Sequence, residues 1–267
     1  YNNSVAAELQ NPINENEPLL RGNLFRPIFA ALNSNVKKGY TSIKVFEVGN
    51  VFKKAKNGFT QSLHLSGMIY HHEPQQTWSQ KELAYDFYSL KAEISKLLQT
   101  LGMQNIKFQK ASSVMPFNEN ALDIFIDKHK IAVIGEIDLS VTEKLVKKPA
   151  YGFEIYPENI SIASSNPKIK KTSKFPLSPL DLNIVIDKSI AYKEVESLIA
   201  KGSIKFLTSF SLSNTFEGKD IPKGSISMTL RVVFQSNTKS LSESDINGSM
   251  QMILKLLEKR LNAKIRS

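Results

Sequence analysis

The segment from residue 157 to residue 179 constrains the fold more than any other feature of this sequence. It holds four of the eleven prolines, several serines and a lysine-rich run over 168–174. Prolines cannot donate hydrogen bonds to a helix or a sheet, and serine and lysine side chains add little to a core. We therefore expect two domains, over 1–166 and 174–267, joined by a linker over 167–173.

The pattern after the linker predicts a small α+β domain. Strands are expected over 182–186, 204–212, 225–234 and 263–266, with helices over 192–200 and from 242 onwards. Ser242 and Asp245 have the spacing of a capping box at the start of the second helix. Its apolar stripe consists of Ile246, Met250, Ile253, Leu254, Leu257 and Leu261. The order βαββαβ is typical of a ferredoxin-like domain, in which two helices cover one face of a four-stranded antiparallel sheet.

The first 156 residues predict a larger sheet with two helices. Helices are expected over 24–35 and 86–101, and strands over 43–48, 63–70, 122–126, 131–137 and 152–155. The residues expected to face inward are Leu24, Ile28, Ala31 and Leu32 in the first helix, and Phe87, Leu90, Ile94, Leu97, Leu98 and Leu101 in the second. Few of these strands are joined by crossover helices, which favours a mainly antiparallel sheet.

The charge of the chain is concentrated in its second half. Residues 168–267 carry 17 Lys+Arg against 9 Asp+Glu, a net charge of +8, whereas residues 1–167 carry only +2. Such an excess indicates either a polyanionic partner, usually nucleic acid, or a lysine-rich surface that maintains solubility. The chain has no cysteine, no apolar run that could span a bilayer, and no signal-peptide pattern at its start. These absences favour the cytoplasm.

Candidate catalytic residues are few. The four histidines, His64, His71, His72 and His129, show no metal-binding spacing, and we expect them to be solvated and without function. The glycines form no phosphate-binding loop. Glu136 and Asp138 share one strand face, which is weak evidence for acid–base chemistry. The sequence therefore predicts neither an active site nor a metal site.

The open face of the predicted ferredoxin-like sheet is the stronger candidate for a binding site. Asn214 and Phe216 are two residues apart near the end of a strand and so share one face. An aromatic ring on an open sheet can stack an unpaired base, and a neighbouring amide can bond to the base edge. Alternatively, Phe216 caps the hydrophobic core at the strand end.

Several motifs resemble the phenylalanyl-tRNA synthetase beta subunit family, in family order over nearly the whole chain. Those in the second domain are Phe175-Pro176, Asp181-Leu182, the segment 216–224 and Leu241-Ser242-Glu243; those in the first are Asn11-Pro12, 20–24, 45–52, 86–91 and 134–137. The resemblance implies a class II synthetase-like antiparallel module, truncated at its N-terminus and without catalysis, followed by a ferredoxin-fold anticodon-binding domain.

The resemblance also implies partners. Beta subunits of this family pair with an alpha subunit in a heterotetramer. The alpha subunit activates phenylalanine with ATP and magnesium and transfers it to tRNA(Phe). The Phe46-Glu47 segment stands where a class II synthetase motif binds ATP, but the arginine expected ahead of it is missing. We therefore expect no cofactor in this chain itself. The alternative is a free-standing regulatory or protein-interaction module that does not bind tRNA.

Seven residues are candidates for contacts with tRNA. In the family, an aspartate, a tyrosine and a serine contact the first anticodon base, and here Asn214, Phe216 and Ser227 stand in their places. Lys205, Lys219, Lys223 and Arg231 are expected to contact phosphates. The family's arginines ahead of Asp181 are replaced by Pro179 and Leu180.

Overall fold

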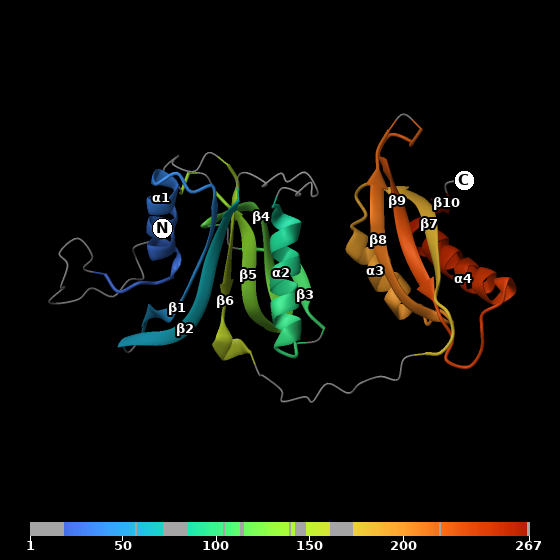
Figure 1. Cartoon of the computed structure of the whole chain (residues 1–267), viewed down its shortest axis with the longest axis horizontal. Coiled ribbons are helices and arrows are strands. Elements are labelled where there is room, and N and C mark those ends of the chain that lie inside the picture. Colours follow the sequence, from blue (N-terminus) through green and yellow to red (C-terminus); the bar gives the residue numbers. More distant parts are fainter. Residues whose placement is uncertain are drawn as a thin grey trace. The chain divides into compact units, whose positions relative to one another are not determined.

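The computed structural model describes residues 19–56, 58–71, 85–103, 105–112, 115–138, 140–141, 148–160, 173–218 and 220–265. The chain divides into two compact units, Tyr1–Pro167 and Lys168–Ser267, and each is considered by itself (Figure 1). The predicted linker lies outside the described residues except for Ser173.

The larger unit is built on a six-stranded sheet. Its strands are β1 (Ser42–Ala55), β2 (Gly58–His71), β3 (Lys107–Lys110), β4 (Phe117–Ile126), β5 (His129–Ile137) and β6 (Ala150–Ile155), in the spatial order β1-β2-β6-β5-β4-β3. Every neighbouring pair is antiparallel, as predicted. The short strand β3 was not predicted, because its four residues are mostly exposed and show no apolar run. A short 3₁₀ helix, Pro157–Asn159, follows β6.

Two helices cover opposite faces of this sheet (Figure 1). Helix α1 (Phe25–Lys37) packs on the face that contains Met68, and helix α2 (Phe87–Thr100) packs on the face that contains Ile69, because successive strand residues point to opposite sides.

Three of the predicted inward positions on these helices are wrong. Ala31 of α1, Leu97 of α2 and Leu101 just after α2 are exposed. Helical spacing alone predicted too wide a buried stripe on each helix. A helix that packs on a sheet buries only the side chains that contact the strands. On α1 the buried residues include Phe25 and Phe29, which the sequence analysis did not single out.

The smaller unit has the predicted ferredoxin-like arrangement. Its elements are β7 (Ser178–Asp187), α3 (Tyr192–Lys201), β8 (Leu207–Phe216), β9 (Ser225–Phe234), α4 (Glu243–Leu261) and β10 (Lys264–Ile265), and the strand order is β10-β7-β9-β8. Both helices pack on one face and share its core, which leaves the other face of the sheet open. The capping box of Ser242 and Asp245 is confirmed.

Strand β8 departs from its predicted position and from regular pairing. It begins at Leu207 rather than at residue 204, and extends to Phe216. Leu212 pairs with Leu230 of β9, but the next β9 residue, Thr229, pairs with Asn214. Ser213 is therefore an extra residue, a β-bulge. Strict alternation from the core residue Leu212 would place Asn214 toward the core, and the bulge turns it to the open face instead.

Candidate nucleic-acid interface

The open face of the smaller sheet presents its side chains in rows, because residues that pair across antiparallel strands point to the same side. Three rows cross β7, β9 and β8 in that order. They are Val185–Ser227–Phe216, Asn183–Thr229–Asn214 and Asp181–Arg231–Ser211. These rows contain one cation and one anion, which pair with each other, and are otherwise neutral. A ligand on this face would therefore be held by stacking and hydrogen bonds more than by charge.

Phe216 lies on this face and outside the helix-covered core. Its side chain is 45% exposed. The ring lies against Gly218, where an added Cβ would come within 2.6 Å of a ring atom. Glycine at position 218 thus lets the chain turn back closely beside the ring. The position of the ring favours the stacking interpretation over the core-capping one.

Asn214 and Ser227 flank this ring in different ways. Asn214 is exposed one row away on the same strand. Ser227 pairs directly with Phe216 but is only 3% exposed, so its hydroxyl is covered. It is the third residue of β9, whose bounds are as predicted. Ser225, two residues nearer the turn on the same face, is only half-buried and was not singled out from the sequence.

The predicted phosphate contacts that the structure describes are not brought together. Lys223 is exposed in the turn between β8 and β9, at the same end of the sheet as Phe216. Lys205 is exposed in the turn before β8, and the ten residues of that strand separate it from Phe216 by roughly 30 Å. Lys219 lies outside the described residues.

Arg231 is the fourth predicted phosphate contact, and it forms an ion pair across the open face. Its Nε and Nη2 donate to the two carboxylate oxygens of Asp181 at 2.9 and 3.0 Å. The hydrogen bonds from Arg231 lower the pKa of Asp181, and Asp181 raises the pKa of Arg231. Nη1 takes no part in this pair and is the group left to bond a further anion.

A buried polar cluster in the larger unit corrects the expectation for the histidines. His64 is only 7% exposed; its Nδ1 lies 2.9 Å from Oε1 of Glu154 and its ring packs edge-on against Tyr156. Ser66 and Tyr156 also donate to Glu154, so both carboxylate oxygens are bonded. His64 is therefore a structural residue of the core. His129 is exposed as expected, and the side chains of His71 and His72 lie outside the described residues.

The burial of Tyr156 and the nearby Glu154 carboxylate raise the pKa of the Tyr156 phenol, which stays neutral and donates a hydrogen bond to that carboxylate. The cluster is thus a closed hydrogen-bond network and offers no unpaired base for catalysis.

The Phe46-Glu47 segment lies in β1 at the edge of the larger sheet. The guanidinium of Arg21 bonds to the Glu47 carboxylate and to the backbone oxygen of Asn50. Phe46, in contrast, is 74% exposed, and Val48 and Leu63 are exposed on the same face of the β1–β2 hairpin. Within the described residues, no group of acidic or histidine side chains could hold a metal ion. No helix in the described ranges is long and apolar enough to span a bilayer.

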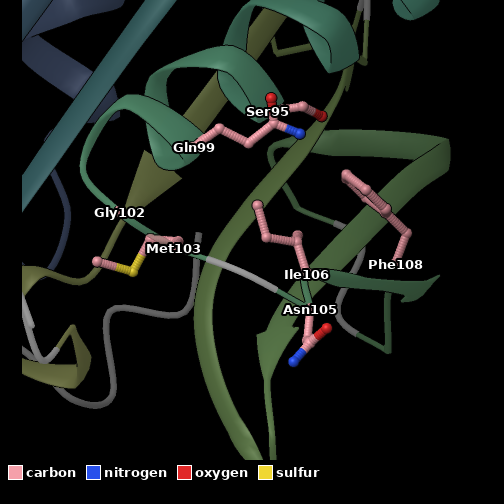
Figure 2. Close-up of a pocket in the computed structure, with 7 residues that line it drawn as sticks. All are labelled: Ser95, Gln99, Gly102, Met103, Asn105, Ile106 and Phe108. Carbon is pink, nitrogen blue, oxygen red and sulfur yellow. The ribbon is translucent and has the colours of Figure 1, made fainter. Parts of the chain in front are cut away.

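A cavity of about 550 Å³ lies between the end of α2 and β3 (Figure 2). Ser95 and Gln99 line it from the helix, Ile106 lines it from just before β3, and Phe108 lines it from β3 itself. The Ser95 hydroxyl donates to the backbone oxygen of Lys91, one turn earlier in the helix. None of the lining residues is acidic or basic, so the cavity offers no acid–base pair.

Family models cover both units. Residues 1–156 match the phenylalanyl tRNA synthetase beta chain CLM domain, and residues 173–266 match the ferredoxin-fold anticodon binding domain. A pyrrolysyl tRNA synthetase structure from Desulfitobacterium hafniense gives a TM-score of 0.43 at 15% identity, over 58% of this chain and 51% of its own, a likeness too distant to carry an inference.

Curated relatives match along almost the entire chain. The phenylalanine–tRNA ligase beta subunits of Lactobacillus acidophilus and Dechloromonas aromatica are 26% and 27% identical over 97% of this chain. That of Thermotoga maritima is 25% identical over the same share. The chain spans 33% of the length of each of these relatives.

Proposed function

Because this chain belongs to the phenylalanyl-tRNA synthetase beta chain family, we propose that it is the part of a phenylalanine–tRNA ligase that binds the anticodon of tRNA(Phe) and supports an alpha subunit. The observation that carries the first role is the exposed ring of Phe216 beside Asn214 on an open, nearly neutral sheet face. An unpaired base stacks on such a ring without regard to sequence, and the amide then discriminates between base edges.

The roles of the predicted tRNA contacts follow from their positions. Phe216 stacks on the first anticodon base, and Asn214 bonds to the edge of that base. Ser227, which pairs with Phe216 across the strands, bonds to the same base after a local rearrangement that uncovers its hydroxyl. Lys223, in the turn, contacts the adjoining phosphates, and Arg231 does so through Nη1. Lys219 remains a candidate from the sequence alone. Lys205 is too far from Phe216 to contact the same nucleotides and binds another part of the tRNA.

The apolar surface of the β1–β2 hairpin supports the second role. Phe46, Val48, Phe59 and Leu63 are exposed on the same face of this hairpin. Contiguous apolar side chains on a sheet face are typical of a protein interface, where aromatic residues are enriched. The occupant that we propose is the alpha subunit.

The proposed division of labour leaves catalysis to the alpha subunit. The alpha subunit activates phenylalanine with ATP and magnesium, and the holoenzyme acts in the cytoplasm as a heterotetramer. In this chain the guanidinium of Arg21 is paired with the Glu47 carboxylate. This guanidinium is therefore not available to bind a nucleotide at the Phe46-Glu47 segment. The chain alone is therefore expected to show no ATP–pyrophosphate exchange with phenylalanine, and exchange above background would contradict this assignment.

A binding titration tests the anticodon role. The full chain is titrated with tRNA(Phe) and with the same tRNA altered only at the first anticodon base. We expect the unaltered tRNA to bind more tightly, and Asn214→Ala to reduce this preference more than it reduces overall affinity. Equal affinity of the wild-type chain for the two tRNAs would mean that only the RNA backbone is bound.

A further inference from the structure

A hydrogen bond on the open face holds an amide next to the proposed site for the first base. Thr229 Oγ1 of β9 donates to Asn183 Oδ1 of β7 at 2.7 Å. This bond ties the Asn183 side chain to Thr229, with the amide oxygen as the acceptor. The amide nitrogen keeps its N–H donors for another partner, and the oxygen keeps a second lone pair.

Asn183 and Asn214 serve different nucleotides. They occupy the same row on either side of Thr229, in strands that are not neighbours. Adjacent strands lie about 4.8 Å apart, so roughly 10 Å separates the two backbones, which is too far for both amides to bond to one base edge. An open four-stranded sheet of this kind has room for two or three bases.

The rows on the two sides of Phe216 differ in what they offer to a neighbouring base. On one side of the row of Phe216, the next pair toward the strand end is Asp187–Ser225, where the Asp187 carboxylate accepts from Ser189 and brings negative charge. On the other side lie the amides, followed by Arg231. Charge does not distinguish the two sides, because Lys188 and Lys223 are exposed near Asp187 and Arg231 is paired with Asp181; the amides of Asn183 and Asn214 are what the second side offers to a base.

We propose that Asn183 reads a second base, an adenine, next to the base that stacks on Phe216. This inference rests on the proposed function. An asparagine amide presents a donor beside an acceptor, the pattern that bonds adenine through two hydrogen bonds. The anticodon that pairs with the phenylalanine codons UUU and UUC has adenine at its second position, in agreement with this chemistry. Thr229 is the positioning residue that holds the amide.

The test compares anticodon stem-loop RNAs bound by the full chain. One probe carries the phenylalanine anticodon, a second has the middle adenine replaced by guanine, a third by cytosine, and a fourth is changed only at the first base. We expect the wild-type chain to prefer adenine at the middle position by about five- to a hundred-fold. Asn183→Ala should bring this ratio close to one and leave the first-base preference unchanged.

Two further variants make the result specific. Asn183→Asp removes the N–H donors and should shift the middle-base preference toward cytosine, whose amino group donates to a carboxylate. Ser209→Ala, on the same face of β8 and two rows from Asn183, should change neither preference. Melting temperatures of all variants show whether the unit is folded.

The outcomes separate this inference from the proposed function. If Asn183→Ala leaves the adenine preference intact, with or without a loss of overall affinity, the Thr229–Asn183 bond only stabilises the sheet and the inference is wrong. If that happens while Phe216→Ala still weakens binding, the proposed function stands. If the wild-type chain binds all four probes alike, both are wrong.

Discussion

In the larger unit, Nδ1 of His64 lies 2.9 Å from Oε1 of Glu154, although the two residues are 90 positions apart in the sequence. They come from β2 and β6, which are neighbours in the sheet, and Ser66 and Tyr156 complete the hydrogen bonds to the carboxylate. A carboxylate with three donors ties the edge hairpin to the middle of the sheet.

Replacing Glu154 by leucine should destabilise the larger unit. His64 and Ser66 would each lose an acceptor while buried, and Tyr156 while partly buried. Each unsatisfied buried donor costs about 1–3 kcal/mol. Urea denaturation of the full chain measures the loss. Glu119→Leu is the control, since Glu119 is exposed on β4. Equal losses in the two variants would show that the cluster contributes no more than a surface residue.

Replacing Phe216 by alanine should weaken the binding of tRNA(Phe). Loss of base stacking on an aromatic ring costs about 1–3 kcal/mol per base, or roughly a ten- to hundred-fold loss of affinity. Phe216→Tyr keeps the ring and should bind at least as well as the wild type. Phe59→Ala removes an exposed ring from the other unit and should have no effect on tRNA. An unchanged affinity for Phe216→Ala would rule out stacking.

Lys223 and Lys205 should differ in which RNA they bind. With a short single-stranded RNA of the anticodon loop, Lys223→Ala should reduce the slope of log affinity against log salt by about 0.7, and Lys205→Ala should not change it. With whole tRNA, both variants should reduce the slope. A Lys205 effect on the short RNA would contradict the distance between the two lysines.

The start of α4 should lose stability in acid. Hydrogen bonds from Lys239 and then from Ser242 lower the pKa of Asp245 to about 2. Because the folded pKa is below the unfolded value of about 3.9, Asp245 stabilises the fold above that value, and this contribution disappears as the pH falls toward 2. The stability difference between wild type and Asp245→Ala should therefore be full at neutral pH and vanish near pH 2.

Ser242→Ala should lower the stability of the smaller unit by about 1 kcal/mol at neutral pH, through loss of the N-cap bond to the backbone of Asp245. Thermal unfolding checks both variants. A difference for Asp245→Ala that grows in acid would contradict the assignment of the low pKa to the folded state.

Placing a charge on the β1–β2 hairpin should prevent assembly with the alpha subunit. Phe46→Glu puts a carboxylate at the most exposed aromatic position of the proposed interface, where burial without a partner is unfavourable. Co-purification with a coexpressed alpha subunit measures assembly. Met252→Glu, exposed on α4 in the other unit, is the control. Normal assembly of Phe46→Glu would place the alpha subunit elsewhere.

Local patterns in the sequence were sufficient for the order of the elements. Alternation and helical spacing identified both helices and five of the six strands of the larger unit, and the Ser242 and Asp245 spacing located the start of α4. These features depend on neighbours within a few residues. The antiparallel fold class followed from the absence of crossover helices.

The role of His64 could not be predicted in the same way. Its partner Glu154 lies far along the chain, and no local pattern connects them. A signal was nevertheless present, because Ser62, His64 and Ser66 alternate on the same face as the buried Met68. Polar residues that continue an inward-facing row are more consistent with a buried network than with solvent.

Successive side chains of β8 alternate between the two faces of the sheet, and the bulge at Ser213 reverses this alternation for the residues that follow it. Phe210 and Leu212 face the core, and regular alternation from them would turn Phe216 into the core as well. The bulge places Phe216 on the open face instead. The side chain at position 213 is then of little consequence, whereas the number of residues between the bulge and Phe216 decides which face of the sheet the ring takes. Deleting Ser213 removes the bulge and keeps the ring outside, whereas deleting Thr215 alone, with the bulge retained, turns the ring inward. An insertion or deletion of one residue between the bulge and Phe216 would therefore change the binding surface more than most substitutions.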